Sequence, residues 1–234
     1  MIRPPRPPRR WPVLAGAVVL VIALVTAGLG ALFPRSPADD SVEAGFARDM
    51  QTHHAQAVRM SMIVRDRTTD AETRLLAYDI ALSQQQQIGQ MYAWLETWGL
   101  PQASLDAPMA WMRRGHGAMP GMTPNATAMP GMTPDTTTMP GMTPNMTAMP
   151  GMATPAQITR LERAGGRDAE ISFLRLMIAH HRGGVQMAQA AVDATGQPQV
   201  RRLAVSIVAA QNSEIDLMKR MLTARGATDV PSPG

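Results

Sequence analysis

Two stretches of the chain, "EAGFARDMQTHHAQAVRM" at residues 43–60 and "EISFLRLMIAHHRGGVQM" at residues 170–187, repeat one pattern. An offset of 127 maps His53 and His54 onto His180 and His181. The same offset continues without a gap as far as Gly99 and Gly226. Other residues of the first copy are also identical to the residue 127 positions later. They include Glu43, Phe46, Arg48, Met50, Val58, Met60, Asp66, Arg74, Leu76, Ala77, Ile80, Gln84, Ile88, Met91 and Leu95. Chance does not preserve one offset over so long a stretch, so the chain contains a duplicated helical hairpin.

The sequence of each copy predicts a hairpin of two amphipathic helices. Residues 41–67 and 168–195 have helical apolar spacing and begin with acidic residues, which suit a helix N-terminus. The second helices begin near residues 70 and 198 and stop at Gly99 and Gly226. The predicted buried stripe of the first of these is Leu75, Leu76, Ile80, Ile88, Met91 and Leu95. A short extra helix is expected over 154–166, with Thr154 as its cap. No segment alternates like a strand, so we predict an all-α four-helix bundle.

The ends of the chain differ from the bundle in composition. Residues 13–33 carry no charge and are long enough to span a bilayer, and the arginines before them favour a cytoplasmic N-terminus. A cleaved signal peptide is the competing interpretation. Both place the rest of the chain outside the cytoplasm. The predicted organisation is a basic tail (1–12), an anchor or leader (13–33), a linker (34–40), the first hairpin (41–99), a Met/Pro/Gly-rich crossover (100–153), the short helix with the second hairpin (154–226) and a tail (227–234).

Charge and cysteine content exclude several functions. The formal net charge of +4 equals the number of arginines in the first ten residues, so the rest of the chain is neutral overall. Nucleic acid is therefore not an expected partner. Because the chain has no cysteine, disulfides, a nucleophilic thiol and thiolate metal ligands are absent. Soft-metal chemistry would have to use methionine sulfur and histidine nitrogen.

Methionine and histidine share one face of the first helix in each hairpin. On a helical wheel of 100° per residue, the four side chains of the first copy fall within an arc of about 120°. The candidate metal ligands are Met50, His53, His54 and Met60, and in the second copy Met177, His180, His181 and Met187. A structural interpretation competes, in which the histidines only form hydrogen bonds and the methionines fill the core. Adjacent histidines are costly to bury without partners, which favours a ligand role.

The ligand types indicate which metal is expected. Thioether is a soft ligand and imidazole suits copper, so the pattern favours copper, as Cu(I) or Cu(II), and silver as its mimic. Methionine is a poor zinc ligand. A di-iron bundle would need a glutamate three residues before the histidine, where this chain has Met50 and Met177.

Weaker signals accompany this face. Gly183 and Gly184 interrupt the predicted helix, and close packing or a local bulge would explain them. The glutamines at 84–87, echoed by Gln211 and Glu214, could orient the imidazoles or form a solvated polar patch.

The crossover repeats "MPGM" every ten residues, four times over. Proline and glycine prevent a helix there, and flexible thioether pairs can wrap a soft cation. The secondary metal candidates are His116, Met119, Met122, Met129, Met132, Met139, Met142, Met149 and Met152. A tolerated low-complexity linker and a sacrificial oxidant scavenger are the competing interpretations.

The doubled pattern, with Met three residues before His-His and another Met six residues after the pair, resembles the bacterial domain of unknown function 305 family. The string "MPGMATPAQITRLERAGGRDAEISFLRLMIAHHRGGVQMA" at 149–188 is especially similar to the family's usual form. The resemblance covers about residues 41–226. It implies a ferritin-like four-helix fold, exported or membrane-anchored, with some members implicated in copper binding and resistance. The family's common "FDxxF" is replaced here by "AEISF", which leaves the role of that acid open.

These observations predict an extracytoplasmic copper-binding protein that sequesters or transfers the metal and supports metal tolerance. A copper efflux or chaperone protein is a candidate partner, and the oligomeric state is open. The rival functions are a structural or sensory bundle and a methionine-based oxidant scavenger. We do not expect an enzyme, because the sequence offers no nucleophile–base pair, phosphate-binding loop or carboxylate dyad.

Overall fold

The computed structural model describes residues 36–115 and 149–229. Within these residues the chain forms six helices and no strand, which confirms the all-helical bundle. The described helices belong to one compact unit, Pro37–Gly234. Among them there is no helix with the length and apolar character needed to cross a membrane. The apolar segment predicted as an anchor, 13–33, lies outside the described residues.

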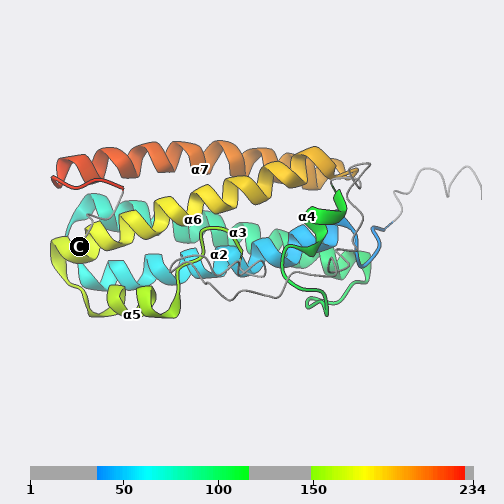
Figure 1. The fold of residues 1–234 in the computed structure, drawn as a ribbon, viewed down its shortest axis with the longest axis horizontal. Coiled ribbons are helices and arrows are strands. Elements are labelled where there is room, and N and C mark those ends of the chain that lie inside the picture. The colour runs from blue at the N-terminus through cyan, green and yellow to red at the C-terminus, as the bar shows by residue number, and fades with distance from the viewer. Residues whose placement is uncertain (1–35, 116–148, 230–234) are drawn as a thin grey trace, which may run out of the picture. The chain divides into compact units, whose positions relative to one another are not determined.

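Four long helices form two hairpins. Helix α2 (Val42–Arg67) packs against α3 (Ala71–Trp98), and α6 (Gly166–Ala194) packs against α7 (Pro198–Ala224). The two hairpins meet mainly through α2 and α6, which lie side by side in Figure 1. These four helices begin and end within two residues of the boundaries expected from the duplication.

The sequence explains where the helices begin and end. The Ser41 hydroxyl accepts a hydrogen bond from the Ala44 amide at the start of α2, and the Asp70 carboxylate caps α3 in the same way through Thr73. Gly99 ends α3 in the left-handed conformation, with φ of 69°. The short helix α5 (Pro155–Arg163) begins with a reciprocal capping box between Thr154 and Gln157.

The core consists of two clusters of buried apolar side chains. Met60 and Met177 belong to one cluster, whereas Met50 and Met187 belong to the other. Because Met60 corresponds to Met187 and Met50 to Met177 in the duplication, each cluster receives one methionine of each kind. This exchange shows that α2 and α6 run in opposite directions past a pseudo-twofold axis.

A polar contact of the same kind joins the hairpins at each end. The Thr195 hydroxyl, after α6, donates to the carboxylate of Glu43 at the start of α2 over 2.7 Å. The Thr68 hydroxyl, after α2, donates to Glu170 at the start of α6 over 2.5 Å. Both glutamates are buried, and the two contacts are related by the duplication. They fix how far α2 can slide along α6.

Two sequence predictions need correction. Leu75 was expected in the buried stripe of α3, but its side chain is 62% exposed. The other predicted residues Leu76, Ile80, Met91 and Leu95 are buried, Ile88 is half-buried, and the same stripe also includes Gln84. The crossover also contains a helix that was not predicted, α4 (Ala110–Gly115).

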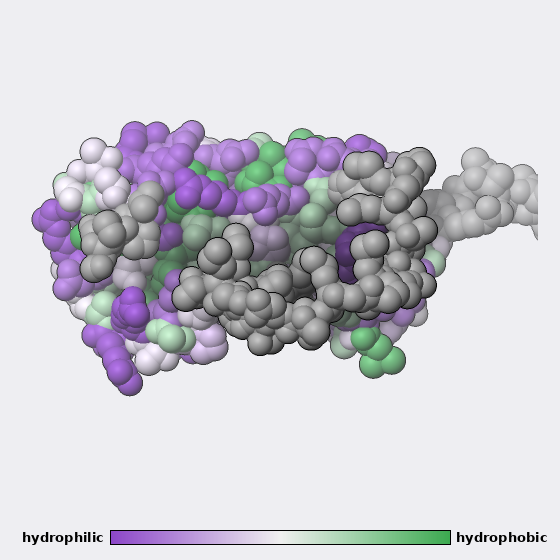
Figure 2. Space-filling model, in the orientation of Figure 1, coloured by the Kyte–Doolittle hydropathy of each residue, from purple (hydrophilic) through white to green (hydrophobic). Residues whose placement is uncertain are grey.

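On the face drawn in Figure 2, hydrophilic residues predominate along α7 and around α5, as a solvated surface requires.

Candidate metal centre

The four predicted histidines lie at the middle of the contact between α2 and α6, and all are fully buried. The rings of His53 and His180 stack across the pseudo-twofold axis, with centroids 3.7 Å apart and planes inclined by 32°. The ring centroids of His53 and His54 are 6.4 Å apart, and those of His180 and His181 are 6.3 Å apart. The structure therefore brings the two His-His pairs together.

Two of the histidines bond to backbone carbonyls. The Nε2 atom of His53 lies 3.0 Å from the Pro150 carbonyl oxygen, and Nε2 of His180 lies 3.0 Å from the carbonyl oxygen of His53. Since a carbonyl oxygen can only accept, both Nε2 atoms must carry the proton. The lone pair of each neutral ring is then on Nδ1.

The other two histidines bond to side chains of the second helix in their own hairpin. Nε2 of His54 donates to Oε1 of Gln87 over 2.7 Å, and Nε2 of His181 donates to Oε2 of Glu214 over 2.6 Å. Gln87 and Glu214 correspond in the duplication. These contacts orient the rings and again place the lone pair on Nδ1.

In the part of the chain that the structure describes, all four Nδ1 atoms are buried without a hydrogen-bond partner. The side-chain amides of Gln84 and Gln211 are also buried and unpartnered there. Native proteins rarely leave so many polar atoms unpaired in one place, so these atoms call for a partner such as a bound water or ion. An imidazole lone pair of this kind suits a metal that accepts nitrogen ligands.

Burial keeps the imidazoles of His53, His54 and His180 neutral. It lowers the pKa of His53 to about 4 and that of His54 to about 3, and it holds the pKa of His180 well below its usual value. Positive charge on neighbouring histidines adds to the effect in each case. Neutral rings can bind a metal without first losing a proton.

The four predicted methionines lie on the same helices and are completely buried. Among the described residues, no three or more His, Asp or Glu side chains are grouped so as to hold a metal ion. A metal ion in this interior would therefore need thioether or carboxamide ligands in addition to imidazole. Met50 and Met187 on one side, and Met60 and Met177 on the other, are the methionines available.

A strap formed by Met149–Ala153 crosses the histidines. Its Met149–Met152 turn has Gly151 at φ of 74°, and the Pro150 carbonyl of the turn is the one that His53 contacts. The Gln56 side chain accepts from the Ala153 amide over 2.6 Å and donates to its carbonyl over 2.9 Å. Gly183 gives the strap room, because a Cβ there would lie 2.0 Å from the Pro150 oxygen.

Close packing is thus the reason for Gly183 and Gly184 in the middle of α6, and the helix continues through them without a bulge. A Cβ at Gly184 would lie 2.4 Å from Oε1 of Gln211. Met149 and Met152 of the strap are half-buried. The other secondary candidates, His116, Met119, Met122, Met129, Met132, Met139 and Met142, lie outside the described residues.

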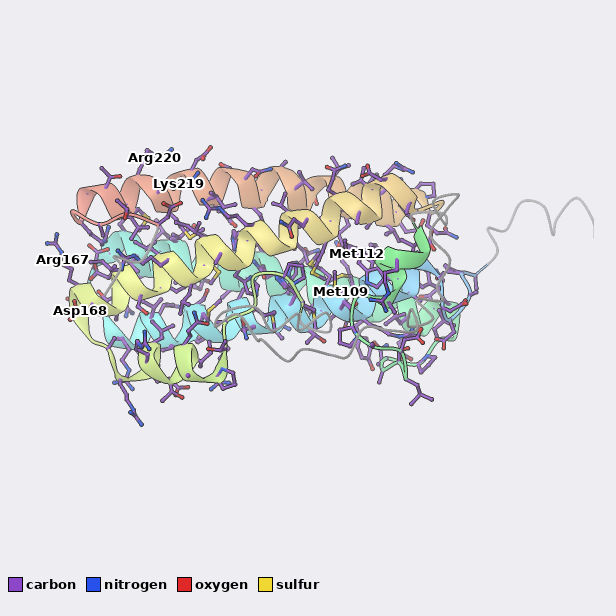
Figure 3. The ribbon with its side chains drawn as sticks, in the orientation of Figure 1. Met109, Met112, Arg167, Asp168, Lys219 and Arg220 are labelled. Atoms are coloured by element: carbon purple, nitrogen blue, oxygen red, sulfur yellow. The ribbon has the colours of Figure 1, made fainter. Side chains whose placement is uncertain are left out.

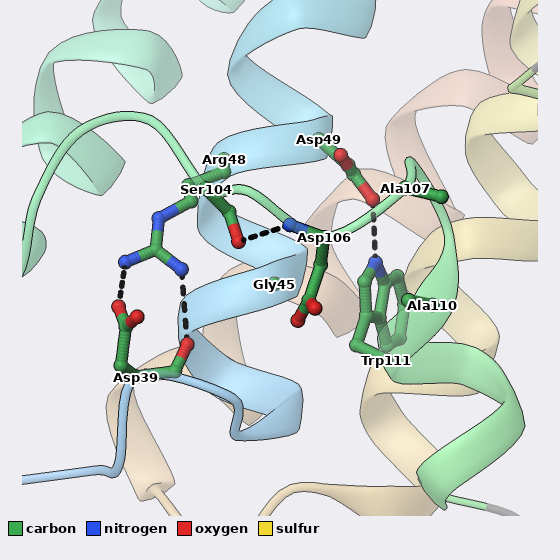
Figure 4. Close-up of a pocket in the computed structure, with 9 residues that line it drawn as sticks. All are labelled: Asp39, Gly45, Arg48, Asp49, Ser104, Asp106, Ala107, Ala110 and Trp111. Atoms are coloured by element: carbon green, nitrogen blue, oxygen red, sulfur yellow. Dashed lines mark hydrogen bonds and ion pairs between the residues drawn. The ribbon is translucent and has the colours of Figure 1, made fainter.

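Sequence reasoning missed the segment around α4, which contains Met109 and Met112 and packs against α2 and α6 (Figure 3). The Asp49 carboxylate accepts hydrogen bonds from the Met109 amide over 2.7 Å and from the Trp111 indole over 2.8 Å, and Figure 4 shows the contact with the indole. A Cβ on Gly45 would lie 2.5 Å from Trp111. The sequence signal that could have revealed this segment is a break in the duplication, because Asp49 and Gly45 correspond to Leu176 and Ser172 in the second copy.

The bundle is similar to several solved structures. A DUF305 protein from Streptomyces coelicolor is 44% identical, with a TM-score of 0.68, over 83% of this chain and 99% of that one. A DUF305 fragment from Deinococcus radiodurans is 31% identical, with a TM-score of 0.59, over 82% and 99%. The Cu(I)-bound form of CopM is 20% identical, with a TM-score of 0.51, over 79% and 96%, and shares the fold.

No curated protein sequence matches the chain. The family model described as "Domain of unknown function (DUF305)" matches residues 43–222, which include both hairpins, both His-His pairs and the strap. The chain belongs to the DUF305 family.

Proposed function

We propose that this protein binds copper through the histidines and methionines between α2 and α6, and that it stores or transfers the metal. The observation that carries the proposal is the state of the four imidazoles. Each has its Nε2 proton engaged by an acceptor, and each Nδ1 is buried and unpartnered. Hydrogen bonding alone would not leave the same nitrogen unpaired four times.

The ligand chemistry supports copper over other metals. Neutral imidazole and thioether are the donors that Cu(I) accepts, and imidazole also suits Cu(II). CopM, which shares the fold at 20–22% identity, has been crystallised with Cu(I), Cu(II) and silver bound. Silver is the expected mimic of Cu(I) in this chain as well.

A storage or transfer role, rather than catalysis, fits the closed surroundings of the histidines. The rings are fully buried and covered by the strap, so a substrate has no access to a bound metal. Copper could be collected first by the methionines of the crossover and then passed to the interior. We place this activity outside the cytoplasm, in a chain held by or cleaved from its apolar segment 13–33, with a copper pump or chaperone as partner.

The test is a titration of residues 37–234 with Cu(I), in competition with a chromophoric chelator and with quantitation of bound metal. The proposal predicts tight binding that survives deletion of 118–148, since the deletion leaves the strap intact. His54→Gln and His181→Gln should each reduce bound copper, whereas Gln85→Ala on the exposed side of α3 should not. Circular dichroism checks that each variant is folded.

The structural interpretation makes the opposite prediction. If the histidines serve only to hold the bundle together, the wild-type fragment will bind no copper and the two histidine variants will lower stability alone. Binding that disappears with the 118–148 deletion, and is unchanged by the histidine variants, would assign the function to the crossover instead.

A further inference from the structure

The two halves of the candidate centre differ in charge. Gln87 accepts the proton of His54 with a neutral amide, whereas Glu214 accepts that of His181 with a carboxylate. The two residues occupy the same position in the duplicated hairpins, on α3 and α7. The hydrogen bonds have nearly the same length, 2.7 Å and 2.6 Å. The duplication has thus kept the geometry and changed the charge.

The side chains of the candidate site are of the same type in both halves, although His53 contacts the Pro150 carbonyl and His180 contacts the His53 carbonyl, which are both uncharged acceptors. The paired histidines, the two methionines and the unpartnered glutamine are identical in type and buried in each copy: Met50, His53, His54, Met60 and Gln84 in the first, and Met177, His180, His181, Met187 and Gln211 in the second. Among the hydrogen bonds of the four histidines, the difference in charge between the halves therefore lies at Gln87 and Glu214.

A carboxylate acceptor changes the imidazole that donates to it. The charge-assisted bond draws the Nε2 proton towards the carboxylate and leaves more electron density on Nδ1, which is the atom free to bind metal. The negative charge also attracts the ion itself. This attraction grows with the charge of the ion, so it favours a doubly charged ion over a singly charged one. Glu214 is mostly shielded from solvent, with its side chain 23% exposed, which preserves part of this effect.

We propose that Glu214 is a positioning residue that makes the His181 half the preferred place for Cu(II), while the uncharged His54–Gln87 half prefers Cu(I) or Ag(I). The inference rests on the proposed function and adds oxidation-state selectivity to it. One bundle would then accept copper in both oxidation states without a change of fold.

The experiment uses the full-length chain in four forms: wild type, Glu214→Gln, Gln87→Glu and the double variant that exchanges the two residues. Cu(II) affinity is measured by chelator competition in air, and Cu(I) affinity under anaerobic reducing conditions. Glu214→Gln should weaken Cu(II) binding by about 10- to 100-fold, the usual effect of losing such a partner, and Cu(I) binding by less. Gln87→Glu should strengthen Cu(II) binding, and the double variant should restore one strong Cu(II) site.

Electron paramagnetic resonance of bound Cu(II) supplies a readout that a purely structural role would not move. Its hyperfine pattern should change in Glu214→Gln and return in the double variant. Gln86→Glu is the matched control, because it adds a carboxylate at an exposed position next to Gln87. An equal loss of affinity for both ions in Glu214→Gln, or none, would overturn the inference and leave copper binding intact. A wild-type chain that binds neither ion would overturn the proposed function itself.

Discussion

Gly183 and Gly89 both lie inside long helices, but their surroundings are opposite. A Cβ at position 183 would meet the Pro150 carbonyl oxygen at 2.0 Å, whereas a Cβ at position 89 would have no neighbour within 4 Å. We expect Gly183→Ala to lower the free energy of unfolding by about 1–3 kcal/mol, since backbone atoms must shift to admit the methyl group. The strap would move, and His53 would lose its acceptor.

The comparison with Gly89→Ala isolates this effect from helix propensity. Alanine is favoured over glycine inside a helix, so Gly89→Ala should raise the free energy of unfolding by up to about 1 kcal/mol. Urea unfolding of both variants, followed by circular dichroism, measures the two changes. If Gly183→Ala were as stable as the wild type, the strap would not pack against α6 as described.

At the scale of elements, the contacts between hairpins at the two ends are related by the duplication but unequal in strength. If Thr195 is replaced by valine, Glu43 keeps the Gly196 amide at 2.9 Å as a partner. If Thr68 is replaced, Glu170 keeps a charged partner, because Nε of Arg225 donates to it over 2.7 Å. We expect Thr195→Val to cost about 1–3 kcal/mol and Thr68→Val to cost less. Chemical denaturation of both variants tests the order, and the reverse order would contradict it.

The elements also show how far sequence reasoning reaches. The offset of 127 predicted the four long helices and the His-Met faces, because a duplicated pattern states the same helical period twice. Leu75 was misplaced because Leu75 and Leu76 both fit an apolar stripe, and tertiary contacts chose Leu76. The strap and the segment around α4 could not be predicted, because their positions depend on contacts such as Gln56 with Ala153 that leave no periodic signal. The unpaired Nδ1 atoms could not be predicted either, because tertiary contacts decide which nitrogen of each imidazole ring meets an acceptor.

For the molecule as a whole, the stacked histidines impose a pH dependence. His53, His54 and His180 have pKa values lowered by burial, whereas unfolded histidine titrates near 6.5. Well above pH 6.5 these histidines are neutral in both states, and their contribution to stability is complete. As the pH falls below 6.5, the unfolded chain takes up protons that the folded chain refuses, so the free energy of unfolding decreases. The decrease continues until the pH passes the folded values, about 4 for His53 and about 3 for His54.

We therefore expect the metal-free protein to lose stability between pH 6.5 and 5, before most carboxylates begin to titrate. Each of the three histidines contributes a slope of up to about 1.4 kcal/mol per pH unit in this window. Asp49 acts in the opposite direction, because burial raises its pKa and the folded state binds its proton more readily. Urea unfolding at pH 7.5, 6.0 and 5.0 measures the net slope, and His54→Gln should reduce it by about one histidine's share. A slope that is flat in this window, or unchanged in His54→Gln, would mean that the rings are not held neutral. Saturating Cu(I) at pH 6.0 should recover much of the lost stability, since a ligand that binds the folded state alone shifts the equilibrium towards it.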